Sequence, residues 1–268
     1  MSFNIGDIVS RNSYGNDIIF KIVAIENSVI KLCGVDVRLC ADSKAEDLRK
    51  EDSSKLNDDK EFLDRFDGIT TLNRDEYFYM PGKVLHIDSD ADYLNRCMKF
   101  YENTGIKAYG VHLEEEDVAM EIDRYLKDLN PDIVVITGHD SYVKSKGSKQ
   151  DLKNYKNSEN FVKAIEVSRK YENNPDKLII IAGACQSDYE ELIKAGANFA
   201  SSPKRINIHA LDPAIIAVST ALSDRSKSID LLSILNKTKY GPEGIGGIVT
   251  MGVMYVGYPR WLKKSKER

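Results

Sequence analysis

From residue 82 onward, short apolar runs alternate with amphipathic stretches, and this alternation constrains the fold more than any other feature of the sequence. Strands are expected at 83–87, 107–112, 132–137 and 177–182, each followed by a helix, at 90–103, 115–129, 159–171 and 187–195. Two of the runs, 133–136 and 178–181, are apolar without interruption, as expected for strands covered on both faces. Strand and helix in this order favour right-handed crossovers, so we expect an α/β domain with a parallel sheet flanked by helices.

The two ends of the chain differ from this pattern. Residues 5–11, 18–25, 29–33 and 35–40 read as short strands separated by turns, which predicts a small SH3-like β-barrel over residues 1–42. The next segment, 43–75, is highly charged with helical tendency, and we expect a linker there. The remaining 76–268 form the α/β domain, which ends with helices at 213–223 and 229–236 and a strand within 244–257.

Composition excludes several classes of protein. The net charge of -4 provides no basic field for nucleic acid, and no apolar run approaches the roughly 18 residues that span a bilayer. The N-terminal residues lack a signal-peptide pattern, so we expect a cytoplasmic protein that does not bind membranes. The four cysteines have no metal-binding spacing, and we expect reduced thiols, no metal and no cofactor. The oligomeric state is left open.

Two predicted strands end in residues that can carry chemistry. His139 follows strand 132–137 and Cys185 follows strand 177–182. If these parallel strands are neighbours, their ends lie about 5 Å apart, within reach of a thiol and an imidazole. Ser187 and Glu190 form a capping box, which predicts a helix starting directly behind the thiol. Its free N–H groups could stabilise an oxyanion, and the helix favours a thiolate at Cys185.

Structural roles are the alternative for each of these residues. A lone buried cysteine or histidine usually packs in the core, and only the occurrence of both at consecutive strand ends makes function the better interpretation. The remaining candidates, His86, His112, His209, Cys33, Cys40 and Cys97, are expected to be structural.

Asp88 and Asp90 follow the first strand of the α/β domain and have two interpretations. Asp88, or Ser89 after it, could cap the next helix. Alternatively, a carboxylate at this rim could bind the basic side chain of a substrate, arginine above all, through two hydrogen bonds. Asp140, next to His139, could orient the imidazole.

The strand-end sequences V-V-I-T-G-H-D and I-I-I-A-G-A-C-Q resemble those of the caspase, gingipain and clostripain clan of cysteine peptidases. Within that clan, nearly the whole chain is similar to the YabG family of sporulation-specific proteases. The segments that carry this resemblance are G-D-I-V-x-R-x-S-Y at 6–14, G-K-V-L-H-I-D-S-D at 82–90, I-T-G-H-D at 136–140, A-G-A-C-Q-S at 182–187 and A-G-A-N-F-A-S-S-P at 195–203.

The resemblance implies a caspase-like fold and a cysteine endopeptidase that cleaves spore coat and cortex-associated proteins after arginine, in the mother cell and at the forming coat. Cys185 is then the nucleophile and His139 the general acid and base. The clan has glycine after the histidine, and its N–H helps to form the oxyanion hole; here Asp140 follows, so the backbone N–H groups of Asp140 and Cys185 are the candidates. The clan places a pocket residue near the end of its first strand, which makes Asp88 the first choice and Asp90 the second.

Two other functions fit the same residues. A thiol acyltransferase or amidotransferase could use the Cys185 and His139 pair on this fold. A spore coat assembly scaffold without enzymatic activity would leave Cys185 an ordinary thiol.

Overall fold

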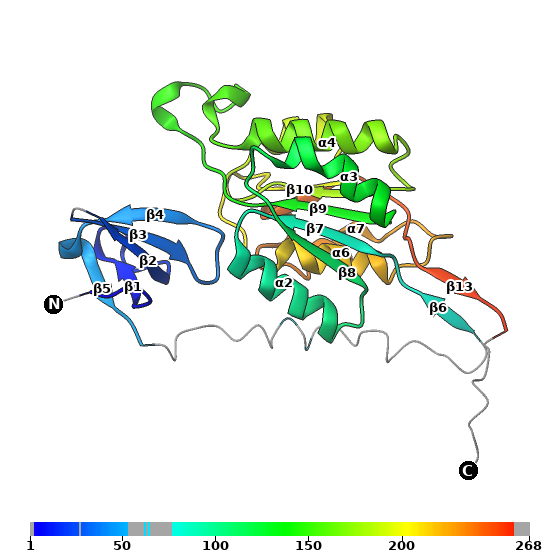
Figure 1. The fold of residues 1–268 in the computed structure, drawn as a ribbon, viewed down its shortest axis with the longest axis horizontal. Helices are drawn as coiled ribbons and strands as arrows, with labels where there is room; N and C mark the ends of the chain where they lie inside the picture. Colours follow the sequence, from blue (N-terminus) through cyan, green and yellow to red (C-terminus); the bar gives the residue numbers. More distant parts are fainter. Residues whose placement is uncertain (1–2, 27, 53–61, 63, 65–76, 260–268) are drawn as a thin grey trace, which may run out of the picture.

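The computed structural model describes residues 3–26, 28–52, 62, 64 and 77–259. Its main domain is built on a six-stranded sheet (Figure 1) with the strand order β12-β11-β10-β9-β7-β8. Five of these strands are parallel, and β12 pairs antiparallel with β11 at the edge. The strands are β7 (Val84–Asp88), β8 (Ala108–His112), β9 (Ile133–Thr137), β10 (Ile179–Ala182), β11 (Phe199–Ser201) and β12 (Ile245–Gly247). The prediction of an α/β domain with a mostly parallel sheet is confirmed.

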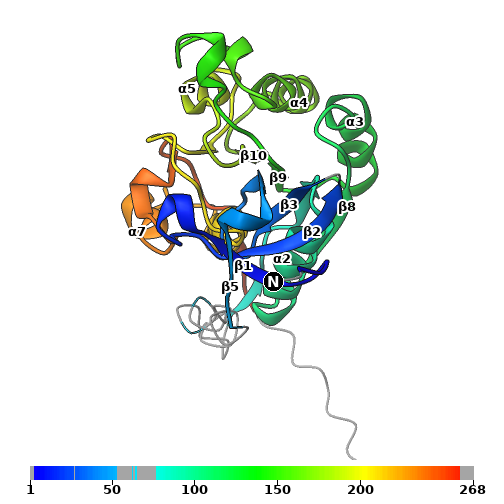
Figure 2. The same cartoon turned by 90° about the vertical axis from the view of Figure 1, so that its left-hand side faces the viewer.

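Helices cover both faces of this sheet (Figure 2). One face carries α3 (Val118–Leu129), α4 (Ser158–Tyr171) and α5 (Tyr189–Lys194), and the other carries α2 (Ala91–Asn103), α6 (Asp212–Ala221) and α7 (Leu231–Leu235). Side chains of β9 and β10 alternate between the two cores that result: Val135 and Ile181 face one, and Val134 and Ile180 face the other. Every residue of these two strands is therefore buried, which explains their unbroken apolar sequences.

The N-terminal residues form a separate five-stranded antiparallel sheet beside the main domain (Figure 1). Its strands, in the order β4-β3-β2-β1-β5, are β1 (Ile8–Arg11), β2 (Phe20–Glu26), β3 (Val29–Gly34), β4 (Cys40–Ser43) and β5 (Leu48–Lys50). The edge strands β4 and β5 are not paired with each other in the described residues, so a closed SH3-like barrel is not confirmed. Most of the expected linker at 43–75 lies outside the described residues, and the domain boundaries stay a prediction.

One expected strand of this sheet is wrong. Residues 35–39 form the connection between β3 and β4, and β4 begins at Cys40. Val35 and Val37 have the alternating pattern of a strand, but Val37 pairs with His209 of the main domain instead of with β3. The connection therefore reaches across to the α/β domain.

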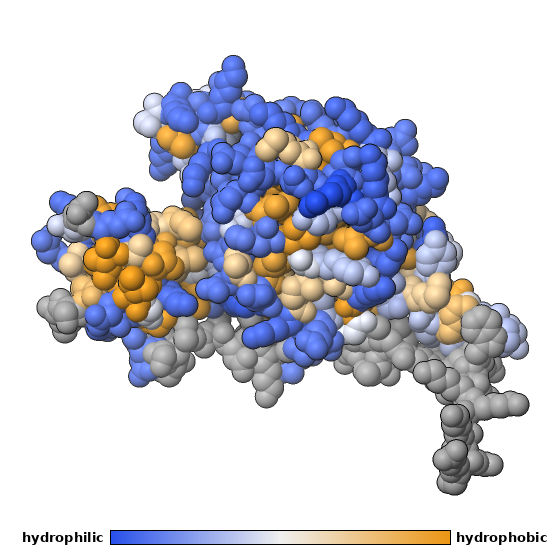
Figure 3. Space-filling model, in the orientation of Figure 1, coloured by the Kyte–Doolittle hydropathy of each residue, from blue (hydrophilic) through white to orange (hydrophobic). Residues whose placement is uncertain are grey.

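The remaining elements are short. A two-stranded sheet joins β6 (Phe78–Met80) to β13 (Tyr255–Gly257), and single 3-10 turns lie at Asn12–Tyr14, Ala45–Asp47, Lys144–Lys146, Leu152–Asn154 and Gly241–Glu243. Among the described residues, no helix is long and apolar enough to cross a membrane. Apolar side chains gather on the N-terminal sheet (Figure 3), and Val23 and Ile25 of β2 are exposed.

Candidate active site at the carboxyl ends of the parallel strands

His139 lies just beyond β9, and its side chain is held between two carboxylates. Nε2 of the imidazole is 3.4 Å from Oδ2 of Asp90, and Nδ1 is 3.8 Å from Oε1 of Glu115. The same Oε1 of Glu115 accepts a hydrogen bond from the backbone N–H of His139 at 2.7 Å. Only 17% of the imidazole is exposed, so water screens these contacts weakly.

These carboxylates control the charge of the imidazole. Burial alone would lower the pKa of His139, but its interactions with Asp90, Cys33 and Glu115 outweigh burial and raise that pKa to about 11. Burial alone would raise the pKa of Glu115, but its hydrogen bonds to His139 and Ser89 lower that pKa to about 2. His139 is therefore an imidazolium at neutral pH in this arrangement.

Cys185 lies three residues beyond the end of β10, and β10 pairs with β9. Its side chain is fully buried, and the backbone N–H of Ile208 donates to its Sγ at 3.3 Å. Burial raises the pKa of the Cys185 thiol to about 12, so the thiol is neutral at pH 7. In the described structure Cys185 and His139 stand at adjacent strand ends but share no hydrogen bond.

The helix behind Cys185 begins later than the capping box predicts. Its N-cap is Asp188, and no side chain caps it, so the role expected for Ser187 is wrong. The hydroxyl of Ser187 instead accepts the N–H of Ala184 at 2.9 Å and donates to Oδ2 of Asp140 at 2.9 Å. Ser187 thus ties the loop that carries Cys185 to the loop that carries His139.

Asp140 accepts the hydrogen bond from Ser187 that ties these two loops together. The sequence suggested that Asp140 could orient the imidazole, and it does not. Its buried carboxylate accepts hydrogen bonds from the hydroxyls of Ser158 and Ser187 and from the backbone N–H groups of Ser141 and Asn157. Among the described residues, the backbone N–H groups of Asp140 and Cys185 have no hydrogen-bond acceptor.

Asp88 and Asp90 have different surroundings. The cap expected at Asp88 or Ser89 is wrong: Asp90 is the N-cap of α2, since its side chain accepts from the N–H groups of Asp92 and Tyr93, and it also faces His139. Asp88 is fully buried, and its Oδ2 accepts from Nη1 of Arg38 at 2.6 Å. Although burial raises the pKa of Asp88, the Arg38 guanidinium holds it well below its usual range, so the carboxylate is charged.

Arg38 comes from the connection between β3 and β4 and is itself fully buried. Its Nε and Nη2 donate to the carbonyl oxygen of Ala210 at 3.2 Å and 3.0 Å, and its guanidinium lies 5.1 Å from the centre of the Tyr93 ring. Cys97 of α2 completes the surroundings, with its Sγ 3.7 Å from Nη2. A carboxylate, a carbonyl oxygen, an aromatic ring and a thiol therefore surround the Arg38 guanidinium.

One group of residues here could hold a metal ion. The ligand atoms of Cys33, Cys40 and His139 all lie within 4.8 Å of one another, and Oδ2 of Asp90 is 3.6 Å from Sγ of Cys33. Two thiols and an imidazole are ligands that suit zinc. Cys33 and Cys40 face each other across β3 and β4, so the cluster joins the N-terminal sheet to the main domain, which no sequence spacing reveals.

Sequence reasoning missed Arg38, Glu115 and the two thiols near His139. Arg38 was read as part of an expected strand, and Glu115 lies in an acidic run that reads as a solvated helix start. Only the short charged run around Glu115, directly after the end of β8, could have placed a carboxylate at this rim.

The comparisons with known proteins agree with the resemblance seen in the sequence. The family model described as YabG peptidase U57 matches residues 4–69 and 64–259. A curated relative, the sporulation-specific protease YabG of Bacillus subtilis (strain 168), is 41% identical over 286 aligned positions. This alignment covers 97% of the chain and 99% of the relative.

Proposed function

Because the chain belongs to the YabG peptidase U57 family and is thus a peptidase of the sporulation-specific protease type, we propose that it is a cysteine endopeptidase that cleaves after arginine. Cys185 is the nucleophile and His139 the general acid and base. Asp88 is the residue that recognises the arginine side chain of the substrate.

The contact between Asp88 and Arg38 carries this proposal. A charged carboxylate that is fully buried at a strand end is costly unless a cation pairs with it. The pocket around Asp88 supplies that cation with a 2.6 Å contact, a carbonyl acceptor and an aromatic face, which together fit a guanidinium. A substrate arginine in this pocket would bring the peptide bond that follows it to Cys185.

The dyad works from neighbouring strand ends. The Cys185 thiol gives its proton to water, the thiolate attacks the carbonyl carbon of the arginine residue, and the imidazolium of His139 protonates the leaving amine. Asp90 and Glu115 are positioning residues, since they hold the imidazole at the rim and keep it charged. Water then hydrolyses the thioester, with neutral His139 as the base.

The oxyanion of the tetrahedral intermediate needs donors close to the sulfur. The backbone N–H groups of Asp140 and Cys185 suit this role, because both lack an acceptor in the described structure. Ser187 and Asp140 hold the two loops together, so the two N–H groups keep a fixed separation.

The substrates follow from the family. The relative from Bacillus subtilis is named a sporulation-specific protease, and we propose that this chain acts on spore coat and cortex-associated proteins in the mother cell, in association with the forming coat. The caspase-like arrangement, with the two catalytic residues after adjacent parallel strands, is part of the same proposal.

Cleavage assays with purified protein test the nucleophile and the base. Wild type, Cys185→Ala and His139→Gln are incubated with a denatured coat protein, and the new N-termini are identified by mass spectrometry. Wild type should cut after arginine only, and both variants should lose at least about 1,000-fold in rate. His112→Gln, which changes an exposed histidine at the same rim, is the matched control and should stay active. Cutting by Cys185→Ala would refute the proposal, and acyl transfer without new N-termini would favour the acyltransferase.

A second assay tests Asp88. Asp88→Asn alone would leave Arg38 buried without a partner, so the comparison is between Arg38→Gln and the double variant Arg38→Gln/Asp88→Asn. Peptides that differ only in arginine or glutamine at the cleaved position report the preference. Losing the charge at 88 should reduce that preference by about 10- to 100-fold, the value of a hydrogen bond to a charged group. An unchanged preference would exclude Asp88 from the pocket.

A further inference from the structure

The segment Asp36–Arg38 lies against the main domain as a short antiparallel strand. Val37 pairs with His209, the N–H of Arg38 donates to the carbonyl oxygen of Ile208 at 3.1 Å, and the N–H of Ala210 donates to the carbonyl oxygen of Asp36 at 3.0 Å. This is how an extended peptide is bound along a free backbone edge, with main-chain bonds that do not depend on side chains. The edge at 208–210 leads directly into the Arg38 pocket, because Ala210 also binds the guanidinium.

The register of this strand brings Arg38 to the nucleophile. Ile208, whose carbonyl accepts from the N–H of Arg38, is also the residue whose own N–H donates to Sγ of Cys185. The main chain of Arg38 therefore lies beside the thiol while its side chain fills the Asp88 pocket.

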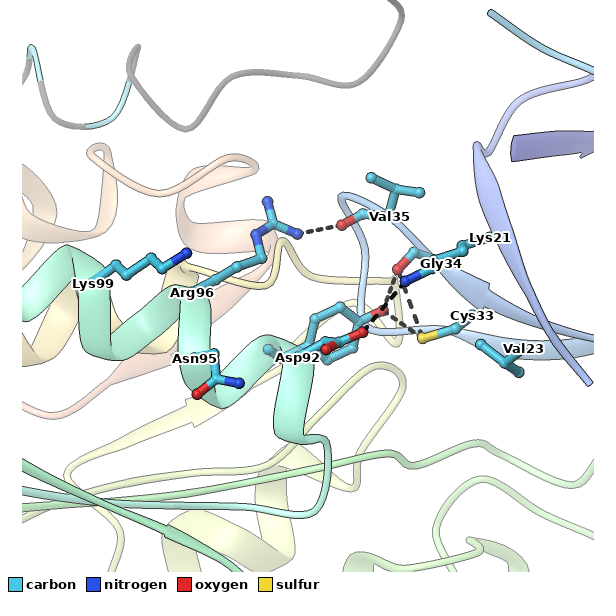
Figure 4. A pocket seen from close by; sticks show the side chains of 10 residues that line it. Lys21, Val23, Cys33, Gly34, Val35, Asp92, Asn95, Arg96 and Lys99 are labelled. Carbon is cyan, nitrogen blue, oxygen red and sulfur yellow. Dashed lines mark hydrogen bonds and ion pairs between the residues drawn. The ribbon is translucent and has the colours of Figure 1, made fainter. Parts of the chain in front are cut away.

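Helix α2 holds the connection in this position from the other side. The Tyr93 hydroxyl lies within hydrogen-bond distance of the carbonyl oxygens of Gly34 and Val37 and can donate to either, and the Arg96 guanidinium donates to that of Val35 (Figure 4). A neighbouring pocket of about 360 Å³ opens between β2, β3 and α2, so only the connection itself packs tightly against the site. Contacts on both sides thus fix 34–38 in one conformation.

We propose that this chain is its own first substrate: the segment Asp36–Arg38 occupies the substrate site, and Cys185 cleaves the Arg38–Leu39 bond within the same molecule before other proteins can enter. This inference rests on the proposed function. It adds a specific bond, an intramolecular order of events and a role for the N-terminal sheet as the part of the chain that blocks the site.

The chemistry is that of the proposed peptidase. The Cys185 thiol gives its proton to water, its sulfur bonds to the Arg38 carbonyl carbon, and the C–N bond to Leu39 breaks as the imidazolium of His139 protonates the Leu39 nitrogen. Water then hydrolyses the thioester, which leaves a carboxylate on Arg38 and restores the thiol. No oxidant or other reactant is needed.

Cleavage at this bond would not by itself separate the fragments. β3 ends at Gly34 and β4 begins at Cys40, and these two strands pair from Ile30↔Ser43 to Cys33↔Cys40. Residues 1–38 and 39–268 would therefore stay associated through the sheet, while the new ends at 38 and 39 become free to leave the site. Detection requires denaturing conditions.

The test is intact-mass measurement of denatured full-length protein over time, together with hydrolysis of an arginyl peptide added in trans. Wild type should convert to fragments that end at Arg38 and begin at Leu39, at a rate that does not change on tenfold dilution. Peptide hydrolysis should begin with a lag that follows this conversion. Cys185→Ala should remain one chain.

Variants at residue 38 separate this inference from the proposed function. Arg38→Gln should remain one chain; because it loses the guanidinium bonds to Asp88 and Ala210, its segment is held more weakly, so an excess of the arginyl peptide should displace it and be hydrolysed without a lag. Arg38→Lys, which keeps a cation beside Asp88, should self-cleave at least about 10-fold more slowly than wild type. Arg49→Gln changes an exposed arginine of the same sheet and should behave as wild type. Peptide hydrolysis by wild type with an intact Arg38–Leu39 bond and no lag would overturn the inference and leave the proposed function standing. Failure of all variants to hydrolyse the peptide would instead overturn the proposed function.

Discussion

Replacing Asp90 with asparagine should change the charge of His139 without removing the cap of α2. Asparagine caps a helix about as well as aspartate, so the bonds to the N–H groups of Asp92 and Tyr93 can be kept. The negative charge 3.4 Å from Nε2 of His139 is lost. The variant therefore isolates the electrostatic contribution, and Asp230→Asn, at the N-cap of α7, is a matched control away from His139.

The expected magnitude follows from the position of the carboxylate. An opposite charge within about 4 to 6 Å moves a pKa by about 1 to 3 units, so Asp90→Asn should lower the pKa of His139 from about 11 to about 8 to 10. Each unit corresponds to about 1.4 kcal/mol, and the free energy of unfolding at pH 6 should fall by about 1.4 to 4 kcal/mol. The control should lose a few tenths of a kcal/mol, as expected for an exposed charge at a helix end.

The pH dependence has a definite sign. The pKa of folded His139 lies above the unfolded value of about 6.5, so the contribution of His139 to stability is complete below pH 6.5 and is lost as the pH rises toward about 11. The stability difference between the variant and the parent chain should persist from pH 6 to pH 8 and shrink above the lowered pKa.

Nuclear magnetic resonance measures the titration directly. In a Cys185→Ala background, which prevents self-cleavage, the His139 ring signal is assigned by its loss in His139→Gln. It should not titrate between pH 5 and pH 9 in the parent chain, and its midpoint should fall into or near the upper part of that range in Asp90→Asn. A midpoint near 6.5 in the parent chain, or an identical midpoint in both, would refute the assignment of Asp90 as the partner of the imidazolium.

Three further outcomes are expected. In an uncut chain carrying His139→Gln, iodoacetamide at pH 8 should modify exposed Cys40 at least about 10-fold faster than buried Cys185, as counted by peptide mass spectrometry, and equal rates would contradict a neutral buried thiol. Ser187→Ala should lower the free energy of unfolding in urea by about 1 to 3 kcal/mol, because the buried carboxylate of Asp140 loses a donor, and a change below about 0.5 kcal/mol, the size usual for surface substitutions, would argue against that network. Gly183→Ala should lower the melting temperature, since φ is +102° and the added Cβ would lie 2.7 Å from Leu192, and an unchanged melting temperature would show that the loop before Cys185 can relax.

The sequence predicted the parts of the structure that depend on local pattern. Unbroken apolar runs at β9 and β10 identified buried parallel strands, and their order implied that residues following them share one rim of the sheet. For this reason the sequence predicts that His139 and Cys185 lie close together if their two strands are neighbours, and β9 and β10 do pair.

Long-range contacts account for what the sequence did not predict. Whether 35–39 forms a strand or a connection depends on its partner, and the partner is the edge at 208–210, not β3. The Ser187 capping box failed for a similar reason, because Asp140, 47 residues earlier in the chain, competes for the same hydroxyl. Local propensity contains no information about either competitor.

The fully buried pair of Arg38 and Asp88 is hard to explain by stability alone. A buried salt bridge gains little over a well-packed apolar pair, because two charges must leave water, so docking of the N-terminal sheet would be served as well by leucine and valine at these positions. The proposed function gives a charged acid at a strand end next to a thiol a role, because it later receives another cation. Under that proposal, Arg38 neutralises the acid and fills its pocket in the uncut chain, and once Arg38 leaves, the same carboxylate binds the arginine of a substrate. The cost of burying the pair would then be the cost of building a specific pocket, which the chain's own arginine keeps closed until it is cut.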